Sequence, residues 1–380
     1  MVPWVNGLLL ASRALSPAQP GLSNTTVANV RARLIESAKA SWELGVAAEA
    51  HTEFSWPALS VFEPSAFPPP KHLNVSLNAS DVLEIAVKTV SKKPATSLPL
   101  IAAQGSAADP ASIGVAVLLA NWTSPDPSST AFSDAASGQL EHLLHHVPRS
   151  PQGAISHRQD EVQLWADFVY MVPPFIAYYG ALQGGNGGRA LLQFAYNQVR
   201  LYRDALRDSS GLWRHITLGK WQDDTHWGTG NAWAAAGMLR VLQALNHSSD
   251  ARLFVEHQAN LTQWIHEIET ASWSYQKRDG GLFNVIDSPK SFSDTSSTAL
   301  LASVTYRMAT FTNDTTLIPA ADKALAFIKD NINEKGWLEG TVDPYTFHTQ
   351  NAKGSYSPEG QAFVLLLHAA HTAWIKSLTK

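Results

Sequence analysis

Helical spacing of apolar residues, which recurs along almost the whole chain, most constrains the fold. Apolar side chains return every three or four residues, as on one face of an α-helix. The windows are Val27–Val46, Val82–Val90, Ile113–Asn121, Ala135–His146, Leu164–Leu182, Ala190–Leu206, Ala232–Leu245, Leu253–Ile268, Thr298–Thr310, Ile318–Ile332 and Gln361–Leu378. No run of alternating apolar and polar residues competes with them, and Pro- and Gly-rich loops lie at 67–70 and 184–188. The sequence therefore predicts an all-α protein of eleven or twelve helices.

A short repeat indicates how these helices are arranged. Gly211-Leu212-Trp213, Gly281-Leu282-Phe283 and Gly336-Trp337-Leu338 each follow one predicted helix and precede the next, at spacings of 70 and 55 residues. Such periods are typical of helical hairpins that bury their faces against neighbouring hairpins. Six hairpins fit 380 residues, so we expect one domain over residues 1–380, folded as an (α/α)6 barrel whose loops form a cup at one end. A two-domain helical fold is the alternative, although no linker separates two halves.

Charge and hydropathy exclude several classes of protein. The formal net charge is −4, and we find no basic stripe of the kind that nucleic-acid binding requires. No apolar run approaches the roughly 18 residues that span a bilayer. We therefore expect neither a nucleic-acid partner nor a membrane anchor.

The number of N-glycosylation acceptors points to secretion. Seven asparagines head an N-x-S/T sequon, against about two or three expected by chance: Asn24, Asn74, Asn78, Asn121, Asn246, Asn260 and Asn313. The chain has no cysteine, but a core of this size does not need disulfides. Residues 2–11 are mildly apolar, yet they are short for a signal core and lack a basic start. We expect a secreted, extracellular, N-glycosylated protein from a eukaryote.

The most informative window for chemistry contains Asp167, which stands among Trp165, Phe168 and Tyr170 in a segment that otherwise has the composition of a core. An ionised carboxylate there is costly unless it is paired. Two readings follow: Asp167 is hydrogen-bonded for structural reasons, or its pKa is raised, as a general acid near neutral pH requires.

A second window, residues 211–238, is rich in histidine, aspartate and tryptophan. Asp224 is a candidate helix N-cap as well as a candidate acid. His215 and His226 lack the spacing of a metal site, so we expect no metal. Tryptophans near the predicted loops suit sugar stacking as a set, although core packing explains any single one: Trp165, Trp213, Trp221, Trp227 and Trp233.

These windows resemble the unsaturated uronyl hydrolases, especially glycoside hydrolase family 105, the unsaturated rhamnogalacturonyl hydrolases, which are related to family 88. The family element H-x(5)-Q-x-W-x-D-x-x-Y-M corresponds to His157, Gln163, Trp165, Asp167, Tyr170 and Met171. The G-L-[FWY]-x-H element corresponds to residues 211–215, and W-x-R-G-N-G-W to 227–233. Looser matches lie at 279–283, 294–297 and 356–361. The similarity runs from about residue 100 to the C-terminus.

The resemblance implies an (α/α)6 barrel that removes a terminal 4,5-unsaturated uronic acid by hydrating its vinyl ether, without a cofactor. Asp167 would protonate C4, and a water deprotonated by a carboxylate would add at C5. Asp109, in a matching D-x(4)-G context, is the second catalytic candidate; its place before Pro110 also suits a helix start. The second acid stays open between Asp109, Asp224 and Asp294.

The expected contacts to the oligosaccharide follow the same motifs. They are His157, Trp165, Tyr170, Met171, Trp213, His215, Trp227, Thr229, Asn231 and Trp233. One residue departs from the family, because Thr229 stands where the W-x-R-G-N element has arginine. Threonine cannot replace a guanidinium that grips a uronate. The candidates to compensate are Lys220, Arg214, Arg158 and His215.

Two alternatives remain at this stage. An inverting (α/α)6 glycosidase acting on a saturated glycan would place two acids about 6.5 to 9.5 Å apart. A catalytically silent carbohydrate-binding protein would have no need of a costly carboxyl at Asp167.

Overall fold

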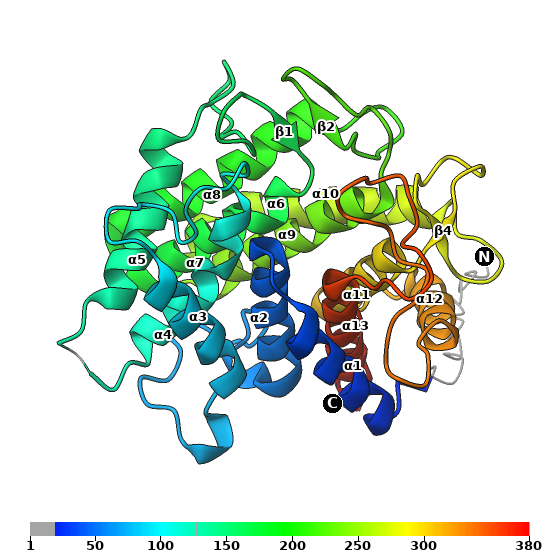
Figure 1. The fold of residues 1–380 in the computed structure, drawn as a ribbon, viewed down its shortest axis with the longest axis horizontal. Coiled ribbons are helices and arrows are strands. Elements are labelled where there is room, and N and C mark those ends of the chain that lie inside the picture. The colour runs from blue at the N-terminus through cyan, green and yellow to red at the C-terminus, as the bar shows by residue number, and fades with distance from the viewer. Residues whose placement is uncertain (1–19, 127, 380) are drawn as a thin grey trace, which may run out of the picture.

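The computed structural model describes residues 20–126 and 128–379. The segment 2–11, considered above as a signal core, lies outside these residues. Twelve of the helices alternate along the chain between an inner and an outer layer (Figure 1). The inner helices are α2 (Ser41–Ser55), α4 (Gly114–Trp122), α7 (Pro173–Gln183), α9 (Gly228–His247), α11 (Thr295–Thr312) and α13 (Pro358–Ser377). The outer helices are α1 (Asn24–Ser37), α3 (Ser80–Lys92), α5 (Ala131–Glu141), α8 (Gly185–Leu206), α10 (Val255–Trp273) and α12 (Ile318–Asp330).

The inner layer closes on itself. Each inner helix packs against the next along the chain, and α13 packs against α2; the step from α2 to α4 runs through the 3-10 helix η3 (Asp109–Ile113). The expected (α/α)6 barrel is confirmed. Short elements complete the chain: α6 (Phe168–Met171), η1 (Pro57–Leu59), η2 (Val75–Leu77), η4 (His142–His146), η5 (Ala251–Leu253), and the strands β1 (Leu164–Trp165), β2 (Ile216–Thr217), β3 (Leu282–Phe283) and β4 (Ser293–Asp294).

Two expected helices are each divided in the structure. The window Val27–Val46 spans α1 and the start of α2. The break occurs because the Glu43 carboxylate accepts hydrogen bonds from the backbone N–H groups of Lys39 and Ala40, both at 2.8 Å, which caps a new helix. The window Leu164–Leu182 contains β1, α6 and α7, and Pro173 begins the last of these.

The repeated glycines form the same turn in several hairpins, but in a different register from the one predicted. The turn follows α8, α10 and α12, with Gly211, Gly280 and Gly336 at φ values of 88°, 98° and 86°. In each, the backbone N–H three residues before the glycine donates to the carbonyl of the residue after it. The equivalent glycine is thus Gly280 and not Gly281, because only the former adopts the left-handed conformation that the turn requires.

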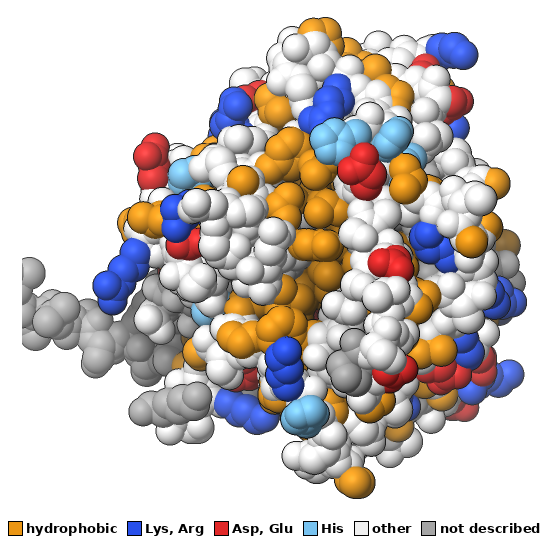
Figure 2. Space-filling model, turned by 90° about the vertical axis from the view of Figure 1, so that its left-hand side faces the viewer, with side chains coloured by type: hydrophobic (Ala, Val, Ile, Leu, Met, Phe, Trp, Pro, Cys, Tyr) orange, Lys and Arg blue, Asp and Glu red, His pale blue; other side chains and the backbone are white. Residues whose placement is uncertain are grey.

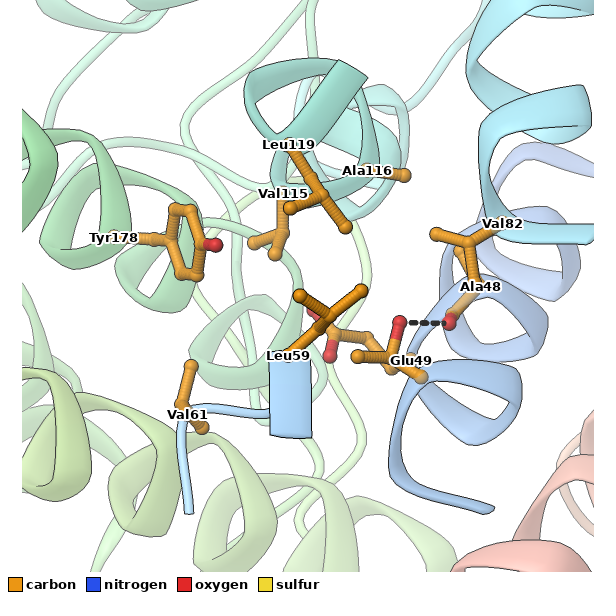
Figure 3. A pocket seen from close by; sticks show the side chains of 10 residues that line it. Ala48, Glu49, Leu59, Val61, Val82, Val115, Ala116, Leu119 and Tyr178 are labelled. Carbon is orange, nitrogen blue, oxygen red and sulfur yellow. Dashed lines mark hydrogen bonds between the residues drawn. The ribbon is translucent and has the colours of Figure 1, made fainter. Parts of the chain in front are cut away.

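The interior between the inner helices is filled with side chains. A cavity of about 10 Å³ lies between α2, α4 and α7, and Figure 3 shows the side chains that line it, among them Glu49, Leu119 and Tyr178. A space of this size holds one water molecule at most. The barrel is therefore a packed core here, and a substrate has to bind at an end.

A buried ion network ties the inner helices together. The Arg240 guanidinium of α9 pairs with Glu49 and Glu53 of α2, and the Arg307 guanidinium of α11 pairs with Glu53 at 2.8 Å. The side chain of Arg240 is only 5% exposed and also faces the ring of Tyr170. Buried charges persist only when they are paired in this way.

The seven sequons share one end of the barrel. Asn121, Asn246 and Asn313 lie at the C-terminal ends of α4, α9 and α11, and Asn74 and Asn78 lie between α2 and α3. Asn24 begins the outer helix α1, and Asn260 lies in the first half of the outer helix α10. Because outer helices run opposite to inner ones, these two also lie toward the C-terminal ends of the inner helices.

Seen from the side of α3, α4 and α5, the surface has a hollow in which apolar side chains gather between polar ridges (Figure 2). Lys and Arg side chains on this face are scattered among acidic ones. Within residues 20–126 and 128–379, no helix combines the length and apolar character needed to cross a membrane.

Candidate active site

The candidate site lies at the end opposite the sequons, where the N-termini of the inner helices converge. This end receives a side chain from every hairpin: Trp42 of α2, Asp109 before α4, Asp167 before α6 and α7, Thr229 of α9, Asp294 before α11 and Glu359 of α13. Helix N-termini carry partial positive charge and unpaired N–H groups. We call this end of the barrel, with the side chains just named, the cup. It is suited to holding carboxylates and to binding an acidic or polar ligand.

The H-x(5)-Q-x-W-x-D motif is a folding unit as well as a chemical one. The N–H of His157 donates to the carbonyl of Gln163 at 2.8 Å, which closes the intervening loop. The Gln163 side chain accepts from the indole Nε1 of Trp165 at 2.8 Å and donates to the backbone of Trp221 at 2.6 Å. The ring of His157 stacks on Trp165 at 4.6 Å with an interplanar angle of 7°. Gln163 and His157 together fix the orientation of Trp165.

Pairing of β1 with β2 brings His215 to Asp167. Trp165 lies opposite Ile216, and the N–H of Ala166 donates to the carbonyl of His215 at 2.9 Å. The imidazole Nε2 then lies 3.4 Å from Oδ2 of Asp167, and its Nδ1 lies 2.9 Å from Oδ2 of Asp223. Asp167 is 9% exposed, and its Oδ2 has no hydrogen-bond partner among the described residues. This oxygen is itself buried, and His215 approaches it at 3.4 Å.

Asp109 contacts the imidazole of His157, the ring that stacks on Trp165. Its Oδ1 is 3.6 Å from the imidazole Nε2 of His157, and its backbone N–H donates to the Ser106 hydroxyl at 3.0 Å. The carboxylates of Asp109 and Asp167 are close enough that the charge of one affects the titration of the other. The structure therefore brings together the two predicted catalytic residues with His157, Trp165 and His215.

The surroundings give these groups different protonation states. Burial raises the pKa of Asp109 to about 7, and the charge of Asp167 adds to this rise, while Ser106 and Arg158 oppose it. Burial lowers the pKa of His157 to about 4, so its ring is neutral at pH 7. Burial alone would also lower the pKa of His215, but Asp167 and Asp223 raise it above its ordinary value. Near neutral pH the site thus combines a partly protonated carboxyl, Asp109, with an imidazole, His215, whose charged form two neighbouring carboxyl groups favour.

Two tryptophans and a phenylalanine form a partly exposed wall of the cup, which we call the aromatic wall: Trp165, Trp221 and Phe347. The ring centroid of Trp165 lies 5.5 Å from that of Trp221 and 5.5 Å from that of Phe347. Trp221 is 45% exposed. The side chain of Asn284 donates to the carbonyl of Phe347 at 2.8 Å and holds this loop in place. The faces of such rings suit the apolar faces of a pyranose.

Most of the other predicted contact residues are buried in the structure. Their exposed fractions are at most 3%: Tyr170, Met171, Trp213, Trp227, Thr229, Asn231 and Trp233. Three of the five tryptophans considered as stacking platforms thus belong to the core. Their rings pack against other buried rings instead: Trp233 contacts Tyr170 and Phe363, and Trp227 contacts His215.

Some of these buried residues position the site. The Asn231 side chain accepts from the N–H of Trp213 at 2.8 Å and donates to the carbonyls of Trp213 and Trp227 at 2.9 and 3.0 Å. The Thr229 hydroxyl donates to Asp294 at 3.0 Å. These contacts fix the loops that carry His215 and the start of α9.

The structure separates the three candidates for the second acid. Asp294 is fully buried and caps α11; its carboxylate accepts from the N–H groups of Ser296, Ser297 and Val342. Asp224 has a 73% exposed side chain, and the N-cap of α9 is Trp227, so Asp224 is neither the N-cap nor a buried acid. Asp109 alone of the three contacts the group around Asp167.

Several residues of the cup were not predicted as site residues. Glu359 is 2% exposed, accepts from the indole of Trp42 at 2.6 Å, and has a pKa that burial raises to about 8. Asp223 accepts from His215 and from His348, each at 2.9 Å. Glu359 lies in the 356–361 motif, which was a signal for it; Phe347 and His348 reach the cup from a loop without such a signal.

The histidines of residues 211–238 have carboxylate partners. His226 lies between Asp208 and Asp287, at 2.9 and 2.8 Å. Over residues 20–126 and 128–379, no group of three or more His, Cys, Asp or Glu side chains has an arrangement that could hold a metal ion.

Comparisons with known proteins agree on one family of folds. The model of Glycosyl Hydrolase Family 88 matches residues 77–371. A possible member of the GH105 family from Salmonella enterica serovar Paratyphi A superposes with a TM-score of 0.74 at 16% identity, covering 96% of this chain and 98% of the other. A family 105 glycoside hydrolase from C. acetobutylicum gives 0.69 at 13% identity, with 93% and 99% covered. An unsaturated glucuronyl hydrolase specific for heparin gives 0.62 at 10% identity, with 93% and 96% covered. No curated protein matches the sequence.

Proposed function

We propose that this chain, which belongs to glycosyl hydrolase family 88 and is thus a glycoside hydrolase, removes a terminal 4,5-unsaturated uronic acid from oligosaccharides made by polysaccharide lyases. The observation that carries the proposal is the pair Asp109 and Asp167 at the bottom of the cup, with His157 and His215 beside them and the aromatic wall above. The rhamnogalacturonan type is the substrate we favour, because the motif around Asp167 resembles family 105.

The reaction requires two protein groups that act on the same sugar ring: a proton donor and a carboxylate. A carboxyl O–H adds its proton to C4, and the C4=C5 electron pair forms the new C–H bond. The positive charge that develops at C5 is shared with the ring oxygen, and water adds at C5 while a carboxylate takes its proton. The resulting hemiketal opens at the C5–O5 bond, which leaves a ketone at C5 and a hemiacetal at C1. The hemiacetal then breaks down to an aldehyde and releases the next sugar with its oxygen protonated.

The site supplies both states near pH 7. About half of the Asp109 carboxyls hold a proton at pH 7, since burial raises the pKa of this group to about 7. Asp167 is paired with His215, and its side chain is 12% exposed. The sequence left two readings of Asp167 open, structural hydrogen bonding or a raised pKa. Because burial raises the pKa of Asp109, we propose that the two carboxyls share the acid and base roles between them.

The test uses an unsaturated disaccharide made by a rhamnogalacturonan lyase and follows the ultraviolet absorbance of its conjugated double bond. We expect the wild-type protein and the exposed control Asp224→Asn to remove the signal, and Asp167→Asn to remove it at least about 100-fold more slowly. An unchanged signal with all three proteins would overturn the proposal in favour of a saturated glycan or of binding without catalysis. Replacing the substrate with an unsaturated glucuronyl disaccharide tests the uronide class.

We also propose that the protein is secreted and N-glycosylated, which rests on the seven sequons. Four of the acceptor asparagines are exposed: Asn24, Asn74, Asn78 and Asn313. Expression in a yeast and digestion with an amide-cleaving glycosidase should lower the apparent mass; no change would refute this.

A further inference from the structure

A uronate substrate brings a negative charge into a cup that already contains several acidic groups. Asp109, Asp167, Asp223 and Glu359 all lie there. A carboxylate is recognised most strongly by a guanidinium, through two parallel hydrogen bonds. Thr229, at the position of the family arginine, is fully buried, and its hydroxyl is engaged by Asp294. The cation must therefore come from another residue.

Arg158 is held beside the acid pair by its backbone. It pairs across an antiparallel bridge with Ser106, and the flanking hydrogen bonds join Ala107 to His157 at 2.8 Å and Gln159 to Gly105 at 3.0 Å. This places Arg158 next to His157 in the chain and opposite the residues that lead into Asp109. Burial is the main influence on both pKa values, raising that of Asp109 and lowering that of His157. The positive charge of Arg158 lowers the pKa of each, which indicates that its guanidinium lies close to both groups.

The guanidinium of Arg158 is held in one orientation, but only one of its nitrogens donates a hydrogen bond within the described residues. A methyl group added to Gly105 would lie 2.9 and 3.1 Å from its two terminal nitrogens, so the guanidinium rests against the bare backbone of Gly105. Its Nε donates to the exposed Asp160 at 3.3 Å. The two terminal nitrogens have no hydrogen-bond partner among the described residues. The side chain is 32% exposed, so a ligand can reach it.

The other candidates are engaged or lie at the surface. His215 lies between Asp167 and Asp223. Arg214 has a 44% exposed side chain and lies 3.8 Å from Asp224. Lys220 is exposed, and its backbone N–H donates to the Glu161 carboxylate at 2.9 Å.

We propose that Arg158 replaces the family arginine and binds the carboxylate of the terminal unsaturated uronic acid. This assignment rests on the proposed function. It makes Arg158 a specificity-determining residue: the terminal nitrogens grip the carboxylate at C5, which sets C4 and C5 of the same ring beside Asp109 and Asp167.

The experiment compares an unsaturated disaccharide as the free acid with its methyl ester, which has no charge at the uronate. The proteins are the wild type, Arg158→Gln, Arg158→Lys and Arg214→Gln, each first checked by thermal unfolding. We expect the wild type to have a KM for the acid about tenfold or more below that for the ester, because a charge-assisted pair contributes about 1.5 to 3 kcal/mol. Arg158→Gln should raise the KM for the acid to that of the ester and leave the ester unaffected. Arg158→Lys should lie between, since lysine keeps the charge without the fork.

A second variant guards against a failure of Arg158→Gln to fold. Gly105→Ala keeps the arginine but pushes its guanidinium away, and it should raise the KM for the acid alone. Equal losses on acid and ester in Arg158→Gln would indicate a merely structural role and overturn the assignment, as would loss of the acid preference in Arg214→Gln instead. If the wild type cleaves neither probe, the proposed function itself fails, and the assignment falls with it.

Discussion

Activity should fall as the pH rises through about 7, because Asp109 must carry a proton. Burial raises the pKa of this carboxyl from its ordinary value of 3.8 to about 7. About nine-tenths of the molecules then hold the proton at pH 6, and about one-tenth at pH 8. The sign follows from the role: the active form is the protonated one, so kcat/KM is at its plateau below pH 7 and falls about tenfold per unit above it.

The assay is the loss of ultraviolet absorbance of an unsaturated disaccharide between pH 5 and pH 9. The substrate carboxylate stays ionised over this range and adds no transition of its own. Asp109→Asn removes the titrating group, so the remaining activity should be at least about 100-fold lower and should lose the descending limb near 7. Asp224→Asn, with its exposed side chain, is the matched control and should keep the wild-type profile. A wild-type rate that stays constant up to pH 9, or an Asp109→Asn variant with the full descending limb, would refute the reasoning.

Three further predictions concern the scaffold and the wall. Arg240→Met should lower the free energy of unfolding by about 3 to 5 kcal/mol, because it leaves Glu49 and Glu53 buried without their shared cation; calorimetry measures this, and a change below about 1 kcal/mol would contradict it. Gly237→Ala should cost about 1 to 3 kcal/mol, since the added methyl group meets the backbone of α6 beside the site; chemical denaturation measures it, and an unchanged midpoint would count against this packing. Trp221→Ala should raise KM about threefold to tenfold with little effect on kcat, as expected for loss of one stacking face; an equal fall in kcat would contradict a role in binding alone.

The helices could be predicted from the sequence because their apolar spacing continues over many turns, whereas their divisions could not. The break between α1 and α2 depends on a single side chain, Glu43, that caps the second helix. The register of the repeated turn depends on which of two adjacent glycines, Gly280 or Gly281, has a positive φ. Both are local choices that composition does not reveal.

The candidate site was predicted in part for a comparable reason. His157, Trp165 and Asp167 lie within eleven residues and are held together by local hydrogen bonds, so their motif carried the signal. Glu359 and Phe347 reach the same cup only because the inner ring closes between α13 and α2. The burial of Trp233 likewise depends on a distant contact, with Phe363 of α13, which the sequence around the tryptophan does not reveal.

The separation of the sequons from the cup has a practical and a biological consequence. If the acceptors carry glycans, these cover the end of the barrel opposite the cup and leave the cup itself uncovered. The end of a substrate chain then reaches Asp109 and Asp167 without meeting a glycan. The same arrangement would allow oriented immobilisation. A surface coated with a lectin would bind the glycans at the sequon end and leave the cup of each molecule facing the solution. Orientation, which usually has to be engineered into an immobilised enzyme, would then follow from where the chain places its asparagines.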